Sequence, residues 1–268
     1  MIELTLDEIK KIQLEILEEV SRFCDENDIQ YTLYFGSLLG AVRHGGYIPW
    51  DDDIDLAMPR IDYEKFVREF SNSSSHYKII KYDINKRIYA QFAKISRRDT
   101  ILIEDADIEC ELGVNIDVFP IDGIPSNTVL RYITLGTLKT LYALMAIKTV
   151  RSGLRFRSKM KNAALISLKL IFIWISKAQV AMILNYIINA IRSEKSEVVM
   201  HICFDQYRLS DSYLRNLFLV TEKISFENLK VNAIVGREHF LNTHYGDFMT
   251  LPPLEKRVSH HLFKAYKK

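Results

Sequence analysis

The sequence predicts an α/β protein of the α+β type, in which a mixed β-sheet is flanked by helices and a helical insertion interrupts the chain. Apolar residues at helical spacing open the chain, short alternating segments follow, and long apolar helices fill the middle. With 268 residues, 48% of them hydrophobic, the chain can bury a substantial core. We expect one domain over residues 1–268, with a core at about 1–125 completed by about 206–268, and a helical insertion at about 126–205.

The first predicted elements are a helix, a strand and a second, short helix. Residues 5–26 carry apolar side chains at helical spacing, and Thr5 with Glu8 three positions later has the form of a capping box. Residues 29–35 alternate as a strand does and end at Gly36-Ser37, before a short apolar run at 38–42. This order predicts a strand, a tight turn and a short helix.

Further short strands complete the predicted sheet. Pro49 lies in a loop, residues 54–57 form a strand that Pro59 ends, and a helix follows at 61–70. The remaining candidate strands lie at 77–82, 89–96, 100–104 and 114–120.

The middle of the chain, from about 126 to 205, is rich in long apolar helical stretches with dispersed Lys and Arg. Its longest charge-free piece, 178–191, is too short to cross a membrane, which takes about 20 apolar residues. We expect core packing to account for these helices. A basic, partly interfacial surface for lipid-linked substrates, in peripheral contact with the inner face of the membrane, is the alternative.

The charge and cysteine content narrow the class of protein. The 36 Lys and Arg nearly balance the 34 Asp and Glu, so no global field marks a nucleic-acid binder. Three widely spaced cysteines favour reduced thiols, small and buried, and the acidic N-terminal segment does not resemble a signal peptide. These features predict a cytoplasmic protein.

Four acidic residues fall within five positions in the stretch PWDDDIDLAMPR, residues 49–60. Because side chains two apart on a strand share a face, Asp51, Asp53 and Asp55 are predicted to point together, and the role of Asp52 is left open. Clustered carboxylates repel one another unless a cation joins them, and hard oxygen ligands suit Mg²⁺ or Mn²⁺. A solvated acidic loop that binds nothing is the alternative.

Two further elements fit a metal and phosphate site. Asp117 lies on the polar side of the predicted strand 114–120, so it can supply a carboxylate from a second strand. The alternative is an aspartate buried in the core with its hydrogen bonds satisfied there. Gly36-Ser37 at a strand-to-helix turn offers backbone N–H groups to an anionic phosphate. The combination is typical of metal-dependent phosphoryl or nucleotidyl transfer.

Three segments of the chain carry a resemblance to a known family. Residues 31–66, 115–122 and 245–261 resemble the LicD family of phosphotransferases, which has the nucleotidyltransferase fold and is related to fukutin and fukutin-related protein. The resemblance implies transfer of phosphocholine, or a related polyol phosphate, from CDP-choline or another CDP-alcohol to a hydroxyl of a cell-surface glycan or its lipid-linked oligosaccharide precursor, with release of CMP.

The resemblance also implies roles for particular residues. Gly36 and Ser37 match the phosphate-binding turn, Asp53 and Asp55 match the metal-binding pair, and Asp117 matches the third carboxylate, which by analogy accepts the hydroxyl proton. Asp51 matches an additional acid of the related branch. The expected metal ligands are therefore all four aspartates, and the expected catalytic residues are Asp53, Asp55 and Asp117.

Basic side chains are expected to hold the remaining phosphate oxygens. The candidates are Arg43, His44, Lys94, Arg257, His260 and His261, each with an ordinary surface or structural role as the alternative. Trp50 and Tyr47 are candidates for stacking on the cytosine or enclosing a choline ammonium, with core packing as the alternative.

Two other functions remain open from the sequence. An AMP or CMP transferase on the same fold would need the same aspartates, and it would release pyrophosphate. A noncatalytic nucleotide-binding module would be expected to lose the carboxylates, which are all present.

Overall fold

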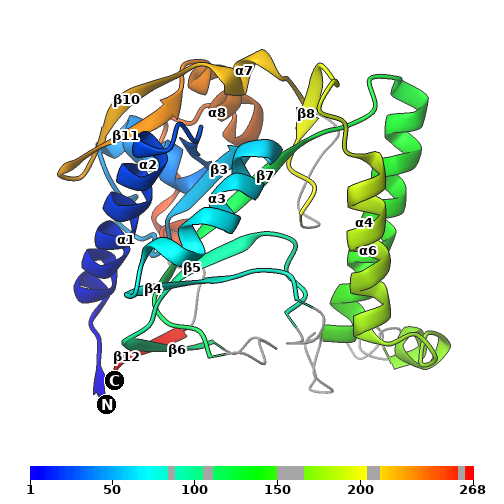
Figure 1. Cartoon of the computed structure of the whole chain (residues 1–268), viewed down its shortest axis with the longest axis horizontal. Helices are drawn as coiled ribbons and strands as arrows, with labels where there is room; N and C mark the ends of the chain where they lie inside the picture. The colour runs from blue at the N-terminus through cyan, green and yellow to red at the C-terminus, as the bar shows by residue number, and fades with distance from the viewer. Residues whose placement is uncertain (84–87, 105–110, 150–165, 204–211, 259–262) are drawn as a thin grey trace.

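The computed structural model describes residues 1–83, 88–104, 111–149, 166–203, 212–258 and 263–268. Its largest sheet runs in the order β2–β3–β7–β5–β4, in which β3 and β7 are parallel and the other neighbours antiparallel. This confirms the predicted mixed sheet (Figure 1). The strands are β2 (Thr32–Leu33), β3 (Asp55–Pro59), β4 (Tyr77–Ile80), β5 (Ala93–Arg97) and β7 (Asn115–Gly123), and β8 (Val198–Met200) and β9 (Tyr213–Leu214) extend the sheet from the end of β7.

Two long helices pack side by side against this sheet. Helix α1 (Leu6–Glu26) begins with the expected capping box, in which the Thr5 side chain accepts the Glu8 N–H and the Glu8 side chain accepts the Thr5 N–H. Phe23 of α1 packs edge-on against Phe66 and Phe70 of α3 (Arg60–Ser73), so the two helices share one hydrophobic core.

Helix α2 (Phe35–His44) covers the other face of the sheet. Phe119 of β7 contacts the rings of Tyr34 and Phe35 at the start of α2, whereas Asp122 of β7 bonds Arg60 of α3. Because residues 119 and 122 differ in parity along the strand, α2 and α3 lie on opposite faces. Asp117 has the parity of Phe119, and its side chain therefore projects on the α2 face.

The helices of the middle region form a separate pair. Helices α4 (Thr128–Thr149) and α6 (Lys177–Ile191) pack through their own hydrophobic cluster, which includes Leu138, Leu184 and Ile188 and is distinct from the main core. Figure 1 shows this pair to one side of the sheet. We propose that 126–205 is an insertion, part of which lies outside the described residues.

The C-terminal part of the chain returns to the N-terminal part. The hairpin of β10 (Thr221–Phe226) and β11 (Leu229–Ile234) and helix α8 (Arg237–Tyr245) contribute to the main core. Strand β12 (Phe263–Lys267) pairs with β6 (Thr100–Glu104) and with β1 (Ile2–Glu3), which places the two termini together (Figure 1). The short elements α7 (Asn216–Leu219) and η2 (Leu254–Lys256) complete the described structure.

Two local predictions need correction. The strand expected at 29–35 is limited to Thr32–Leu33, and α2 already begins at Phe35, so Gly36 and Ser37 lie inside the first helical turn. Phe35 adopts a φ of 40°, in the left-handed region, which turns the chain abruptly from strand to helix. Residues 51–53 form a loop before β3, which begins at Asp55.

The described residues bear on two other expectations from the sequence, the burial of the cysteines and the absence of a membrane-spanning helix. Cys24 and Cys203 are buried, as predicted, and Cys110 lies outside those residues. Across the same part of the chain, we found no helix that is both long enough and apolar enough to span a bilayer.

Candidate active site

Asp55 and Asp117 lie at the same level on neighbouring strands. Asp55 at the start of β3 aligns with Asp117 of the parallel strand β7, and Lys94 of β5 aligns with Asp117 from the other side. Residues that align across a sheet project from the same face. The Lys94 ammonium donates to Asp117 Oδ1 and Oδ2 at 2.8 and 2.9 Å and to Asn115 Oδ1 at 3.4 Å. The sheet therefore presents a row of two carboxylates and one ammonium.

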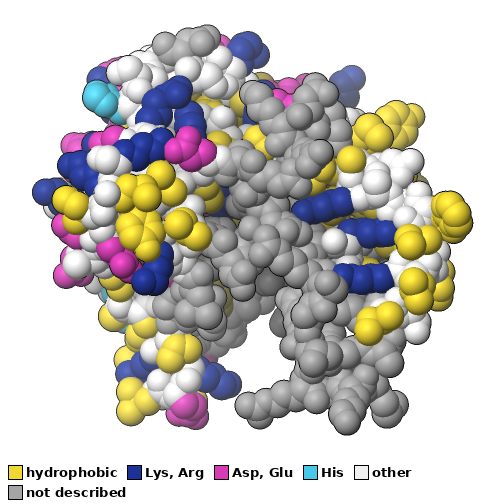
Figure 2. All heavy atoms as spheres, turned by 90° about the horizontal axis from the view of Figure 1, so that it is seen from below, with side chains coloured by type: hydrophobic (Ala, Val, Ile, Leu, Met, Phe, Trp, Pro, Cys, Tyr) yellow, Lys and Arg dark blue, Asp and Glu magenta, His cyan; other side chains and the backbone are white. Residues whose placement is uncertain are grey.

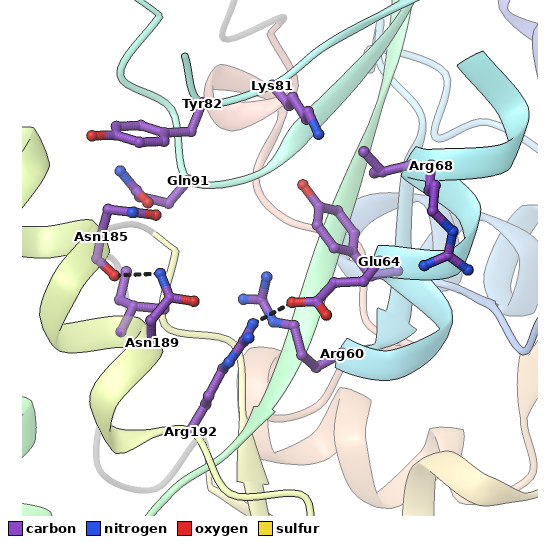
Figure 3. Close-up of a pocket in the computed structure, with 12 residues that line it drawn as sticks. Arg60, Glu64, Arg68, Lys81, Tyr82, Gln91, Asn185, Asn189 and Arg192 are labelled. Atoms are coloured by element: carbon purple, nitrogen blue, oxygen red, sulfur yellow. Dashed lines mark hydrogen bonds and ion pairs between the residues drawn. The ribbon is translucent and has the colours of Figure 1, made fainter. Parts of the chain in front are cut away.

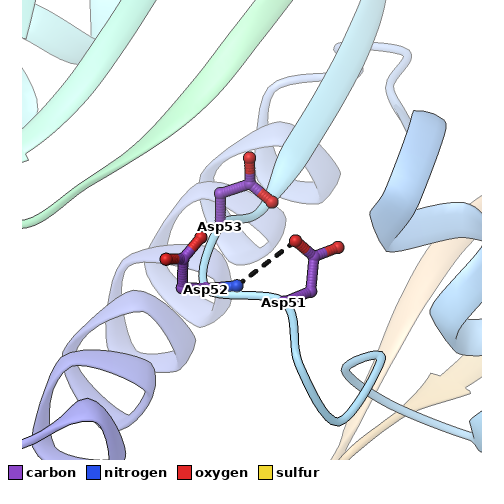
Figure 4. A group of neighbouring side chains, drawn as sticks. All are labelled: Asp51, Asp52 and Asp53. Carbon is purple, nitrogen blue, oxygen red and sulfur yellow. Dashed lines mark hydrogen bonds between the residues drawn. The ribbon is translucent and has the colours of Figure 1, made fainter. Parts of the chain in front are cut away.

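An acidic loop, Asp51 to Asp53, lies immediately before β3. One carboxylate oxygen from each of its three residues lies within 4.8 Å of the others. Figure 4 shows the three side chains on this loop. Burial alternates along this loop although it is not a strand, because Asp52 is only 4% exposed whereas Asp51 and Asp53 are partly exposed. The expected separation of Asp52 is nevertheless incomplete, since its carboxylate belongs to the same cluster.

Burial and the neighbouring carboxylates raise the pKa of Asp55. The pKa of Asp55 lies well above its usual range, chiefly because burial disfavours the charged form, and Asp53, Asp117 and Asp51 add like-charge repulsion. Lys94 offsets part of this effect. Burial and then the carboxylates of the acidic loop also raise the pKa of Tyr47.

A divalent cation fits this set of donors. All the groups are hard carboxylate oxygens, those of the acidic loop are close enough to approach one ion, and their mutual repulsion would be relieved by positive charge. Mg²⁺ and Mn²⁺ both favour such ligands.

Gln13 of α1 anchors the acidic loop to the sheet, and sequence reasoning missed it. Its Nε2 donates to the Asp52 carbonyl at 2.8 Å and to the Asn115 carbonyl at 3.3 Å, and its Oε1 accepts the Tyr47 hydroxyl at 3.0 Å. Gln13 is only 3% exposed. One feature of the sequence could have indicated this role of Gln13: it is a polar residue on the apolar face of the first helix, four positions after Ile9.

The start of α2 fixes the position of β3. The Asp55 N–H donates to Ser37 Oγ at 2.8 Å, and the Tyr34 N–H donates to the Asp55 carbonyl at 2.9 Å. Gly36 lies against the acidic loop, because a Cβ at this position would be 2.7 Å from Asp51 Oδ2. Gly36 and Ser37, the residues expected to bind phosphate, thus lie beside the aspartates at the N-terminal, positive end of a helix. Phosphate binding by these two residues stays a prediction.

The C-terminal block that carried the resemblance lies over the loop that precedes the acids. Arg43 donates from Nη1 to the Phe248 carbonyl at 2.8 Å and from Nε to His44 Nε2 at 3.0 Å. The Arg257 guanidinium lies 5.6 Å from the centre of the Trp50 ring. Burial, and to a smaller extent the neighbouring charge of Arg257, lower the pKa of Arg43. Three of the predicted basic residues, Arg43, His44 and Arg257, therefore gather beside the acidic loop.

Four other residues were candidates from the sequence, namely Tyr47, Trp50, His260 and His261. Tyr47 is 8% exposed and belongs to the main core, and Trp50 packs partly buried against that core. His260 and His261 lie outside the described residues. Tyr245 was not singled out from the sequence, yet burial of its hydroxyl and the charges of Asp55, Asp51 and Asp53 raise its pKa.

A separate polar pocket lies between α3 and α6 (Figure 3). Its volume is about 340 Å³, and the aspartates of the candidate site do not line it. Three of its cations already have carboxylate partners: Arg60 bonds Asp122, Arg192 bonds Glu64, and Arg68 bonds Glu69. The Arg192–Glu64 pair joins the end of α6 to α3, whereas the Arg60 pair joins α3 to β7 and the Arg68 pair lies within α3.

Several known proteins are similar to this chain. Residues 28–128 match the family model described as LicD/FKTN/FKRP, nucleotidyltransferase domain, and this range contains the four predicted aspartates. The chain is 30% identical to the lipopolysaccharide cholinephosphotransferase LicD of Haemophilus influenzae over 99% of both chains. It is also 45% identical to the ribitol 5-phosphate transferase FKRP of human and mouse, over 49 residues that make up 17% of this chain and 10% of each relative. The chain therefore belongs to the LicD family.

Proposed function

We propose that this protein transfers phosphocholine, or a related polyol phosphate, from a CDP-activated alcohol to a hydroxyl group of a cell-surface glycan or its lipid-linked precursor. The observation that carries the proposal is the alignment of Asp55 with Asp117 beside the acidic loop. It occurs in a chain that matches a lipopolysaccharide cholinephosphotransferase along nearly its whole length, which supports phosphotransferase activity.

Asp51, Asp53, Asp55 and Asp117 would hold Mg²⁺ or Mn²⁺. A bound divalent cation would neutralise the negative charge of the donor pyrophosphate. The remaining work of the chain is to position the donor and acceptor. Gly36 and Ser37 would present backbone N–H groups at the start of α2 to the phosphates.

The basic residues would hold the phosphate oxygens that the aspartates repel. Arg43, His44 and Arg257 lie together beside the acidic loop. Lys94 instead forms an ion pair with Asp117, in which it limits the repulsion between that carboxylate and Asp55 before a donor arrives. We propose that this ammonium turns toward a donor phosphate when the site is loaded.

In the reaction, the acceptor oxygen forms a bond to the donor phosphorus that carries the alcohol, and the bond from that phosphorus to the CMP oxygen breaks. The acceptor hydroxyl loses its proton to a carboxylate, for which we propose Asp117. An Asp117→Asn variant tests this assignment, because near-normal turnover with Mg²⁺ binding retained would contradict it.

The experiment that tests the function uses the purified protein with Mg²⁺, crude glycan acceptor, and CDP-choline, CDP-ribitol or CDP-glycerol in turn. We expect CMP release with one of the donors, and loss of that release in Asp53→Asn. Asp25→Asn is the matched control, since Asp25 forms a surface ion pair with Lys223 away from the site. Folded protein that releases no CMP from any of the three donors would contradict the proposal.

An AMP or CMP transferase remains the second candidate, because the same aspartates would serve it. Release of pyrophosphate from ATP or CTP, in place of CMP from a CDP-alcohol, would favour it. A noncatalytic nucleotide-binding module would bind a CDP-alcohol without turnover. We propose a cytoplasmic location for the protein, where CDP-activated donors are made available to it.

A further inference from the structure

The helical pair leaves a large apolar surface exposed. Core packing, the expectation from the sequence, accounts for the inner faces of α4 and α6. It does not account for the short stretch 166–174 or for the outer face of α6. We name these two parts the outer helical surface, and its main exposed side chains are Leu170, Ile171, Ile173, Trp174, Ile183 and Tyr186.

The exposure of these residues is unusual for a folded chain. Trp174 is 89% exposed, Tyr186 74% and Ile171 65%. Figure 2 shows hydrophobic side chains gathered at the edge of the molecule where α4, α6 and residues 166–174 lie, with Lys and Arg side chains beside them. Isolated exposed apolar residues are common, but a contiguous group of them marks a surface that contacts a membrane or another protein.

The charged side chains in the helical region of the sequence are all Lys or Arg. Residues 123–193 contain eleven Lys and Arg and no Asp or Glu, whereas the rest of the chain has 25 Lys and Arg and 34 Asp and Glu. Lys169 lies within the exposed stretch, Lys177 begins α6, and Lys139 is exposed on α4. The near-neutral composition of the whole chain therefore hides a strongly basic region.

We infer that the outer helical surface binds the surface of a membrane that contains anionic lipids. Aromatic and aliphatic side chains flanked by Lys are the composition of segments that lie in the bilayer interface, where Trp and Tyr are enriched. The described helices are not long and apolar enough to span the bilayer, so the contact is peripheral.

A second copy of the chain is a poorer occupant of this surface. Pairing two copies through this surface would bring together Lys side chains of both copies, among them Lys169 within the exposed stretch and Lys139 on α4. Like charges at an interface disfavour association. An anionic bilayer offers both an apolar layer and the opposite charge.

Membrane binding goes beyond the proposed transfer reaction and does not depend on it. If the acceptor is lipid-linked, the surface would hold the enzyme where its substrate lies. Binding to vesicles is measured without turnover, so its absence and a failure of the transferase assay are distinct results.

The experiment measures co-sedimentation of the full chain with vesicles of phosphatidylcholine alone and of phosphatidylglycerol and phosphatidylcholine in a ratio of roughly 1:2. We expect binding to the anionic vesicles, and its loss when the salt concentration rises from about 0.1 M to about 0.5 M. The chain has two tryptophans, so a Trp50→Phe variant reports on Trp174 alone. Its fluorescence should shift to shorter wavelength on binding.

Three variants locate the contact. Ile171→Ser with Trp174→Ser should weaken vesicle binding about tenfold or more, because two apolar anchors are lost. Lys169→Glu should weaken it roughly tenfold at low salt. The matched control is Ile103→Ser on β6, where the side chain is 56% exposed outside the outer helical surface, and it should bind as the unaltered protein does.

Each other outcome overturns the inference. No binding to anionic vesicles would refute it, and so would equal loss of binding in the Ile103→Ser control. Concentration-dependent dimers that Ile171→Ser with Trp174→Ser abolishes, in the absence of vesicle binding, would assign the surface to a second copy of the chain.

Discussion

Replacing Asp55 with Asn should make the metal-free protein more stable while weakening its response to Mg²⁺. Asp55 aligns with Asp117 on the neighbouring strand, and strands are spaced about 4.8 Å apart. Two unit charges about 5 Å apart repel by about 3 kcal/mol at an effective dielectric constant of about 20. The ion pair between Lys94 and Asp117 offsets part of this repulsion, which leaves an expected gain of about 1–2 kcal/mol, or about 2–6 °C in Tm.

Thermal unfolding in chelator and in Mg²⁺ measures both effects. At a Mg²⁺ concentration of 100 times the Kd, binding should stabilise the unaltered protein by about 2.7 kcal/mol, and Asp55→Asn should lose most of this increment. The Asn side chain leaves the backbone bonds of residue 55 to Ser37 and Tyr34 in place. Asp25→Asn, which removes a surface pair with Lys223, should change the stability by less than about 1 kcal/mol.

The pH dependence of this difference has a definite sign. Because the pKa of Asp55 is raised in the folded state, ionisation of its carboxyl destabilises the fold as the pH rises from the unfolded value of about 4 through the folded pKa. Below about pH 4 the group is protonated in both states and the penalty disappears. The stability advantage of Asp55→Asn should therefore narrow as the pH falls toward 4. A metal-free variant that melts below the unaltered protein, or that gains equally from Mg²⁺, would refute this reasoning.

Four further substitutions probe the site and the ion pairs of the separate pocket. Ser37→Ala should cost about 1–3 kcal/mol in urea unfolding, because a backbone N–H loses its buried acceptor; an unchanged midpoint would contradict the positioning role. Arg60→Met should cost about 3–5 kcal/mol, since it leaves Asp122 buried without its partner, whereas Arg192→Met in a more exposed pair should cost less than about 1 kcal/mol; equal losses would count against the difference in burial. Gly36→Ala should leave Tm nearly unchanged, because the added Cβ meets only the flexible end of a side chain, yet weaken Mg²⁺ binding about tenfold in a calorimetric titration. Unaltered Mg²⁺ affinity would argue against a ligand at that end of the acidic loop.

Local patterns predicted most of the elements. The capping box at Thr5 and Glu8 and the alternation at 114–120 correspond to α1 and β7, because they depend on neighbours within one turn or one strand. The same alternation correctly assigned Asp117 to the side of its strand opposite Ile116 and Val118. These patterns require no knowledge of distant contacts.

The residues that hold the site in place could not be predicted from the sequence, because their partners are distant along the chain. Gln13 bonds the carbonyls of Asp52 and Asn115, which are 39 and 102 residues away along the chain. No local pattern carries such a partner, and only a polar residue on an apolar helical face hints at it. The same holds for Arg43, whose contact with Phe248 spans 205 residues.

The sequence by itself determined the mixed α/β class, the aspartates of the candidate site and the resemblance of three segments to the LicD family, because spacing and residue type are local properties. Only the tertiary structure decided that Asp55 and Asp117 align, that Lys94 pairs with Asp117, and that the outer face of α6 stays exposed. Strand register and burial depend on which distant segments pack together, and the energy of that packing is shared over the whole chain.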